Sequence, residues 1–165
     1  MLLTTVEYVK ANSAKTFVIT DAAMNDLIRP ALYDGQHEIV PLVECMQEGA
    51  CVLSSCRPVD LSDSPSPGGE TEGRKDARTE ASSFLSPVDV VGPICESSDF
   101  LAKSRPMPPV AAGDRLAVMS AGAYGASMSS TYNSRPLLPE VLVEGDHWHI
   151  IRRRQTFDEM VGLEI

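Results

Sequence analysis

The sequence has few basic residues for its length. Among 165 residues, 14 Lys and Arg stand against 23 Asp and Glu, which gives a formal net charge of −9. Nucleic acids and anionic membranes both require clustered Lys and Arg in the proteins that bind them. The one basic run, Arg152 to Arg154, follows a strand-like stretch, and we interpret it as a solvated strand end. We therefore expect no nucleic-acid partner and no membrane partner.

Long hydrophobic runs are also missing. No apolar stretch approaches the roughly 20 residues that a membrane-spanning helix needs. The first residues, MLLTTVEYVKAN, lack the basic region and the long apolar region of a signal peptide. We therefore expect a soluble protein inside the cell, in the cytoplasm or, in a eukaryote, in an organelle.

Cysteine pairs of the metal-binding kind are absent. No two of the four cysteines form a C-x-x-C pair, and no histidine stands at zinc-ligand spacing beside them. An intracellular setting disfavours a disulfide. No metal site is predicted. Three of the cysteines cluster and the fourth stands apart: Cys45, Cys51, Cys56 and Cys95.

Large apolar residues are nearly missing between Asp60 and Ser83. The wider segment 46–86 holds Ser-Pro-Ser-Pro, a Gly-Gly pair and mixed charges, a low-complexity composition. Such a segment buries too little apolar surface to offset the entropy of ordering it. We predict a disordered insertion at 46–86 within a single β-domain made of residues 1–45 and 87–165.

Most of the remaining sequence consists of short stretches rich in Val, Ile, Thr and Tyr, bounded by turn residues. Pro41 suggests an edge strand or a bulge, and Pro30 excludes a long helix after Asn25, which could cap a helical turn. Thr156 and Glu159 form a capping-box pattern for a short C-terminal helix. Many short strands and few helices predict a mainly β fold, a barrel or a sandwich. The expected strands are 2–10 and 15–20 as a hairpin, 37–44, 88–93, 113–119 after a turn, and 140–143 with 147–152 as a second hairpin, with a small-residue bend at 121–125.

The stretch VGPICESSDFLAK places Cys95 and Glu96 directly after a β-prone run. An ordinary thiol is mostly protonated at neutral pH, so it can donate a proton to a carbanion. A carboxylate beside it would bind an ammonium group or favour the protonated thiol through its charge. From composition alone, a buried cysteine followed by a solvated turn is the commoner interpretation of a Cys-Glu pair at the end of a strand.

Arg29 and Tyr33 lie four residues apart on a stretch with helical character, so they can share one face. A guanidinium grips both oxygens of a carboxylate, although Arg29 could instead pair with a neighbouring Asp. Tyr124 lies among small residues that let a backbone approach a ligand closely, and its phenol could bind a phosphate or simply fill a barrel corner. Residues 127–135, SMSSTYNSR, are polar and aromatic, which is typical of an interface or a turn.

Together these segments resemble the C-terminal domain of the diaminopimelate decarboxylases, pyridoxal-phosphate enzymes of the alanine-racemase-like fold related to ornithine and arginine decarboxylases. The resemblance covers nearly all of the chain outside the insertion, in the family's order. The matching segments are DAAMNDLIRPALYD at 21–34, VVGPICESSDFLAK at 90–103, SAGAYGASMSSTYNSRP at 120–136 and EVLVEGDHWHIIRRRQTFDEM at 140–160.

The resemblance implies a Greek-key-like β-domain and a role in lysine biosynthesis, the decarboxylation of meso-2,6-diaminopimelate to L-lysine and carbon dioxide. It implies that Cys95 is the proton donor, that Arg29 and Tyr33 bind the distal carboxylate of the substrate, and that Glu96 binds its distal amine. Tyr124 would contact the cofactor. In the family the active unit is a homodimer with shared active sites, and the lysine that holds pyridoxal phosphate lies in an N-terminal (β/α)8 barrel, which nothing in this sequence matches.

The sequence departs from the family at Ala23 and Ser98, where glycine is usual, and in most of the segment 46–86. A family glycine at positive φ would make serine there costly, by about 1 kcal/mol or more. Two alternative interpretations remain open. The chain is a non-catalytic β-domain that dimerises with or regulates a full-length decarboxylase, or it belongs to a related decarboxylase with another substrate.

Overall fold

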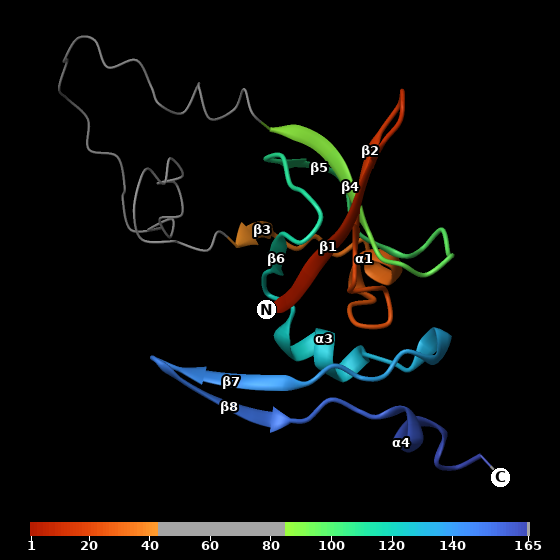
Figure 1. The fold of residues 1–165 in the computed structure, drawn as a ribbon, viewed down its shortest axis with the longest axis vertical. Coiled ribbons are helices and arrows are strands. Elements are labelled where there is room, and N and C mark those ends of the chain that lie inside the picture. The colour runs from red at the N-terminus through yellow and green to blue at the C-terminus, as the bar shows by residue number, and fades with distance from the viewer. Residues whose placement is uncertain (43–84, 165) are drawn as a thin grey trace. The chain divides into compact units, whose positions relative to one another are not determined.

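The computed structural model describes residues 1–42 and 85–164, and its largest element is a six-stranded mixed sheet (Figure 1). The strands stand in the order β3-β6-β1-β2-β4-β5, and a second sheet pairs β7 with β8. The strands are β1 (Leu2–Ala11), β2 (Thr16–Thr20), β3 (Ile39–Leu42), β4 (Ser86–Val91), β5 (Phe100–Met107), β6 (Arg115–Val118), β7 (Glu140–Glu144) and β8 (His147–Arg152). The helices are α1 (Arg29–Tyr33), α3 (Gly122–Met128) and α4 (Phe157–Val161), with a 3₁₀ turn at Tyr132–Ser134.

Strand β1 joins the two halves of the large sheet. Its first residues pair with β6 and its later residues pair with β2, and the register shifts between Val6 and Tyr8. A bulge of this kind bends a strand and increases its twist, so the sheet curls into a half-barrel (Figure 1). The core on its inner side includes Val6, Val18, Leu27, Val90, Leu101, Met107, Leu116 and Val118.

Much of the predicted secondary structure is confirmed. The mainly β fold is present, and the hairpins β1–β2 and β7–β8 form where expected. Pro41 lies in β3, which pairs with β6 alone and is therefore an edge strand. Thr156 caps α4 with the complete capping box to Glu159. The predicted insertion at 46–86 lies outside the described residues except for Leu85 and Ser86, and β4 begins at the latter. Among the described residues, no helix is long and apolar enough to cross a membrane.

Two local predictions were wrong, and one strand was missed. Residues 121–125 are not a bend, because the Gly125 N–H bonds to the Ala121 carbonyl at 3.1 Å and the chain continues as α3. Asn25 does not cap α1, which begins after Ile28 without a side-chain cap. Strand β5 was missed. It pairs with β4 through two register shifts, and these irregularities break the period-two pattern by which a strand is recognised.

A buried carboxylate joins the turn after β4 to the segment that precedes α1. One oxygen of Asp99 accepts the N–H of Met24 and the other accepts the N–H of Ile94, both at 2.7 Å. Asp99 is 4% exposed. Burial raises its pKa, and the two backbone donors oppose this rise. Because Gly92 has no side chain, the Asp99 carboxylate and the backbone of Ala23 can close around it.

A second buried carboxylate, Asp89 of β4, stabilises the bulged pairing with β5. It accepts the Ser104 N–H and the ammonium of Lys15, both at 2.7 Å. Burial acts to raise its pKa, but the hydrogen bonds from Lys15 and Ser104 outweigh burial, and the pKa lies below its ordinary value. Ser104 has a φ of 50°, a strained value for a residue with a side chain. The hydrogen bond to Asp89 therefore helps to hold an unfavourable backbone conformation.

We predict that Asp89→Asn lowers the free energy of unfolding by about 1–2 kcal/mol at neutral pH, because it removes a charge-assisted bond to the half-exposed Lys15. The pKa of Asp89 is lower in the folded chain than in the unfolded chain, where it is about 3.9. The ionised carboxylate therefore contributes its full stability above the pKa of the unfolded chain, and this contribution is lost as the pH falls through the pKa of the folded chain. Urea unfolding from pH 7 to pH 2.5 should therefore show the two proteins converging in acid. The matched control is Asp146→Asn in the exposed β7–β8 turn. A constant difference at all pH values would contradict this assignment.

We predict that Gly92→Ala destabilises the fold by about 1–3 kcal/mol. A Cβ at this position would lie 2.5 Å from both carboxylate oxygens of Asp99 and 2.7 Å from the Ala23 Cα, so the turn would have to open. Gly122→Ala is the matched control, since a Cβ there meets nothing within 4 Å. Thermal unfolding of both variants measures the difference, and equal melting temperatures would show that the turn adapts without cost.

Candidate functional site

Arg29 and Tyr33 are the first and last residues of helix α1, which confirms the helical character predicted for this stretch. The guanidinium carbon of Arg29 lies 4.9 Å from the centroid of the Tyr124 ring in α3, a cation–π contact. Tyr33 and Tyr124 are each 61% exposed. The alternative pairing of Arg29 with an aspartate is not observed: among the described residues Arg29 has no ion pair, and Asp26 pairs instead with Arg135 at 3.8 Å. The Arg29 guanidinium is thus available to a ligand.

The local sequence explains how α1 presents these residues. Pro30 occupies the first turn, where its missing N–H removes no helical hydrogen bond. The helix ends at Asp34, which adopts the left-handed conformation with φ of 51° and donates its N–H to the Arg29 carbonyl. The element is therefore a single short turn with an exposed face.

Cys95 and Glu96 lie in the turn after β4, on the surface. Cys95 is exposed and forms no disulfide. Glu96 accepts a hydrogen bond of 2.5 Å from the Tyr132 hydroxyl. It also lines a cavity of about 300 Å³ together with Asp99 and Lys103. The turn thus offers a thiol and a carboxylate side by side to solvent.

The predicted site residues form two groups within this chain. Among the described residues, no hydrogen bond, ion pair or ring contact joins Cys95 or Glu96 to Arg29, Tyr33 or Tyr124. The first group is Cys95 with Glu96, and its neighbour is Tyr132. The second group is Arg29, Tyr33 and Tyr124, in which Arg29 of α1 contacts the ring of Tyr124 in α3.

The two departures from glycine fit the fold without strain. Among the described residues, positive φ values at non-glycine positions do not include Ser98 or Ala23. The Ser98 hydroxyl lies 3.5 Å from the Met24 sulfur. The expected backbone cost of serine at position 98 is therefore absent.

Sequence reasoning missed Tyr132 as a neighbour of the site and assigned residues 127–135 only to an interface or a turn. This segment is anchored to Asn25, which is 3% exposed. The Ser130 N–H donates to the Asn25 carbonyl at 2.9 Å, and the Arg135 Nε donates to the Asn25 side-chain oxygen at 3.0 Å. Burial raises the pKa of the adjacent Asp26. The hydrogen bond from the Ala23 N–H, the charge of Arg135 and the Asn25 amide oppose this rise. The polar composition of the segment indicated an interface or a turn. It could not indicate the contact with Asn25, because the two lie at least 105 positions apart in the sequence.

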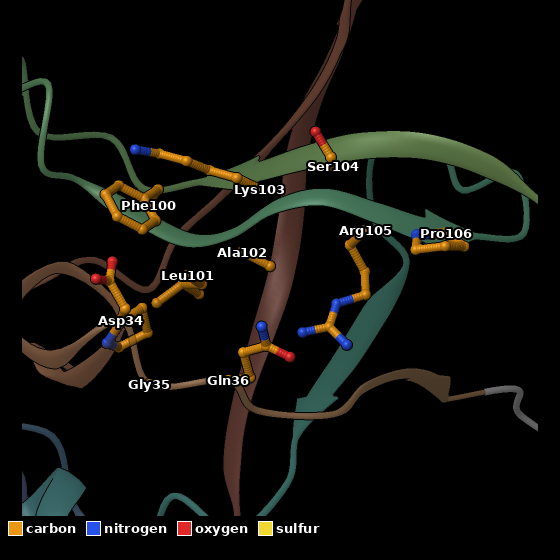
Figure 2. A pocket seen from close by; sticks show the side chains of 11 residues that line it. Asp34, Gly35, Gln36, Phe100, Leu101, Ala102, Lys103, Ser104, Arg105 and Pro106 are labelled. Atoms are coloured by element: carbon orange, nitrogen blue, oxygen red, sulfur yellow. The ribbon is translucent and has the colours of Figure 1, made fainter.

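A larger cavity, about 350 Å³, lies between the end of α1 and β5 (Figure 2). Figure 2 shows the Arg105 guanidinium on the same side as Gln36, while Lys103 extends toward the Phe100 ring, 3.7 Å from its centroid. None of the predicted site residues lines this cavity. We therefore do not assign the predicted site to this cavity. Among the described residues, no three His, Cys, Asp or Glu side chains gather as metal ligands.

Comparison with known proteins identifies strong similarities. Diaminopimelate decarboxylase of Haemophilus influenzae is 40% identical over 164 residues, which is 99% of this chain and 31% of that protein. The enzyme of the same name from Pseudomonas aeruginosa is 43% identical over the same shares of the two chains. The crystal structure of diaminopimelate decarboxylase from Helicobacter pylori complexed with L-lysine is similar with a TM-score of 0.69 and 37% identity, over 99% of this chain and 31% of that one.

The chain spans about a third of the length of the curated relatives that it matches. The family described as "Pyridoxal-dependent decarboxylase, C-terminal sheet domain" matches residues 1–122, which include the whole six-stranded sheet. The match includes Arg29, Tyr33, Cys95 and Glu96, whereas Tyr124 lies two residues beyond it. The chain therefore belongs to the family of the C-terminal sheet domains of pyridoxal-dependent decarboxylases.

Proposed function

We propose that this chain is the sheet domain of a diaminopimelate decarboxylase, and that it supplies substrate-binding and proton-donating residues for the conversion of meso-2,6-diaminopimelate to L-lysine and carbon dioxide. The observation that carries the proposal is Arg29, a cation without a carboxylate partner among the described residues, over the exposed ring of Tyr124. A substrate with a distal carboxylate supplies the missing anion. The names of the relatives point to the same substrate.

The residues present fit pyridoxal phosphate at this surface. Tyr124 is exposed, its hydroxyl has no hydrogen-bond partner among the described residues, and Arg29 adds positive charge beside it. The phenol can donate a hydrogen bond to a phosphate oxygen. When bound, the cofactor provides the electron sink that makes loss of carbon dioxide feasible. Its lysine would come from a pyridoxal-binding barrel domain outside these 165 residues.

The side chains of this chain divide the remaining work. The Arg29 guanidinium and the Tyr33 hydroxyl bind the distal carboxylate, and the Glu96 carboxylate binds the distal ammonium. The Cys95 thiol then holds the proton that the reacting carbon receives after carbon dioxide leaves. A diamino acid without the distal carboxylate, such as ornithine, binds poorly, because it leaves the Arg29 charge unpaired in the complex.

We further propose a homodimer in which the two groups of residues meet across the subunit interface. Cys95 and Glu96 of one chain would then complete the site formed by Arg29, Tyr33 and Tyr124 of its partner. The absence of contacts between the groups within one chain, over the described residues, supports this arrangement. The exposure of Cys95, Tyr33 and Tyr124 supports it as well.

The test joins this chain to the pyridoxal-binding portion of the Aquifex aeolicus relative, which is 40% identical to it over 161 residues. The hybrid should bind pyridoxal phosphate, dimerise and release lysine from meso-diaminopimelate, measured as carbon dioxide and lysine formed. Ornithine and lysine are assayed separately as alternative substrates, through the carbon dioxide that each releases. A hybrid that folds, dimerises and binds the cofactor but turns over none of them would contradict the proposal. Preference for ornithine would reassign the substrate and remove the role of Arg29.

We predict that Cys95→Ala in this hybrid lowers kcat by about 100-fold or more and changes KM less than about threefold, because the thiol acts on the reacting carbon and not on substrate binding. Ser97→Ala, a small change at a neighbouring exposed hydroxyl, is the matched control. An unchanged kcat in Cys95→Ala would remove the thiol from the mechanism.

We predict that Arg29→Lys raises KM for meso-diaminopimelate by roughly 10- to 100-fold, because an ammonium cannot grip both oxygens of a carboxylate. The exposed Arg153→Lys, far along the chain in the segment after β8, controls for the loss of a guanidinium in general. Steady-state kinetics measure both variants. Equal KM values for Arg29→Lys and the unmodified hybrid would show that Arg29 does not bind the substrate.

A further inference from the structure

Tyr132 contacts Glu96 across 36 positions of sequence, and nothing in the proposed mechanism uses it. Its hydroxyl donates a hydrogen bond of 2.5 Å to Glu96 Oε1. A phenol bound to one oxygen leaves the second carboxylate oxygen, Oε2, free to accept a bond from a cation. The phenol can therefore orient the Glu96 carboxylate without blocking the binding of a cation to it.

The backbone around Tyr132 is held in place on both sides. Ser130 exchanges two hydrogen bonds with Asn25: its N–H donates at 2.9 Å, and its carbonyl accepts from the Asn25 amide at 3.3 Å. Arg135 donates to the side chain of the same asparagine at 3.0 Å. Asn25 is buried, so these bonds connect the turn to the body of the domain.

The turn between these anchors is strained. Asn133 and Ser134 have φ values of 58° and 56°, and both residues carry side chains. A left-handed conformation is unfavourable for a residue with a side chain, and more so for Ser134 than for an asparagine. Two consecutive residues of this kind persist because the flanking bonds to Asn25 determine the path of the chain. That path places the phenol of Tyr132 at Glu96.

The carboxylate side of the contact is equally constrained. The Glu96 N–H donates to the Ile94 carbonyl at 2.8 Å, and the Ile94 N–H donates to the buried Asp99. The backbone of Glu96 is therefore fixed, while its side chain is exposed and has Tyr132 as its only hydrogen-bond partner among the described residues. Without the phenol, the carboxylate would sample several rotamers, at a cost in entropy when it binds a cation.

The charges around this pair agree with such a role. The hydrogen bond to Glu96, and then the charge of Glu96, raise the pKa of Tyr132, so the phenol stays protonated and remains a donor. The other charged groups beside Glu96 are Asp99, which is buried, and Lys103, which lines the same cavity. Arg135 is the charged residue of the Tyr132 segment, and it is bonded to Asn25.

We propose that Tyr132 is a positioning residue that holds the Glu96 carboxylate in the orientation that recognises the distal ammonium of the substrate, and so contributes to the selection of a diamino acid. The inference rests on the proposed function, since the role of Glu96 belongs to it. Tyr132 acts through Glu96 and touches neither the cofactor nor the reacting carbon.

The test compares two substrates in the hybrid enzyme: meso-diaminopimelate and 2-aminopimelate, which lacks the distal amine. Tyr132→Phe should raise KM for the diamino acid about tenfold with little change in kcat, and should leave kcat/KM for 2-aminopimelate unchanged. Glu96→Gln should show the same selectivity more strongly. The double variant should have the same KM for meso-diaminopimelate as Glu96→Gln alone, because the phenol acts only through the Glu96 carboxylate. Tyr8→Phe, at an exposed tyrosine of β1, is the matched control.

A second readout needs no turnover. Ultraviolet titration of the 165-residue chain should show a phenol that titrates late, with a pKa above the ordinary value of tyrosine. That late titration should vanish in Tyr132→Phe and move to lower pH in Glu96→Gln.

The outcomes separate the two proposals. If Glu96→Gln affects both substrates alike, the role of Glu96 in the proposed function fails, and the positioning role fails with it. If Glu96→Gln is selective and Tyr132→Phe is not, the proposed function stands and the positioning role of Tyr132 is overturned. A titration that Glu96→Gln leaves unchanged also overturns it.

Discussion

The buried carboxylate of Asp99 is the interaction on which the rest of the site depends. It binds one backbone N–H from the segment before α1 and one from the turn that carries Cys95. An acceptor buried at this position is costly unless both of its oxygens are satisfied, so the two segments must stay together for the domain to be stable. Gly92 permits this closure because any side chain there would occupy the space of the carboxylate. The position of the exposed thiol thus follows from a buried polar contact.

Two other buried polar side chains hold irregular segments in the same way. Asp89 binds the backbone of a strained residue in β5, and Asn25 binds both flanks of the strained turn that carries Tyr132. In each case a buried polar side chain satisfies main-chain groups that the sheet does not pair. Irregular segments then acquire defined paths, and the exposed side chains on them acquire defined positions. A surface site needs such support, because exposed side chains have little packing of their own.

The division of the site residues into two groups has a functional consequence. A single copy of this domain presents a thiol and a carboxylate at one place and a guanidinium with two phenols at another. Each group has exposed side chains, and under the proposed roles neither group alone contains all the residues needed for binding and proton transfer. The proposed homodimer resolves this incompleteness, since two copies related by symmetry would each supply what the other lacks. The active unit would then be the assembly rather than the chain.

How much the sequence determined depends on whether the interaction is local. The hairpins β1–β2 and β7–β8, the edge strand with Pro41 and the capping box at Thr156 follow from neighbouring residues, and all were predicted correctly. The motifs at 21–34 and 90–103 likewise identified the family, because they are contiguous. Strand β5 was missed because its bulged pairing with β4 hides the alternation of its residues. The contacts of Arg29 with Tyr124 and of Glu96 with Tyr132 join residues far apart in the chain. Spacing carries no information about such pairs, and only the order of strands in the sheet and the buried bonds of Asn25 and Asp99 bring them together.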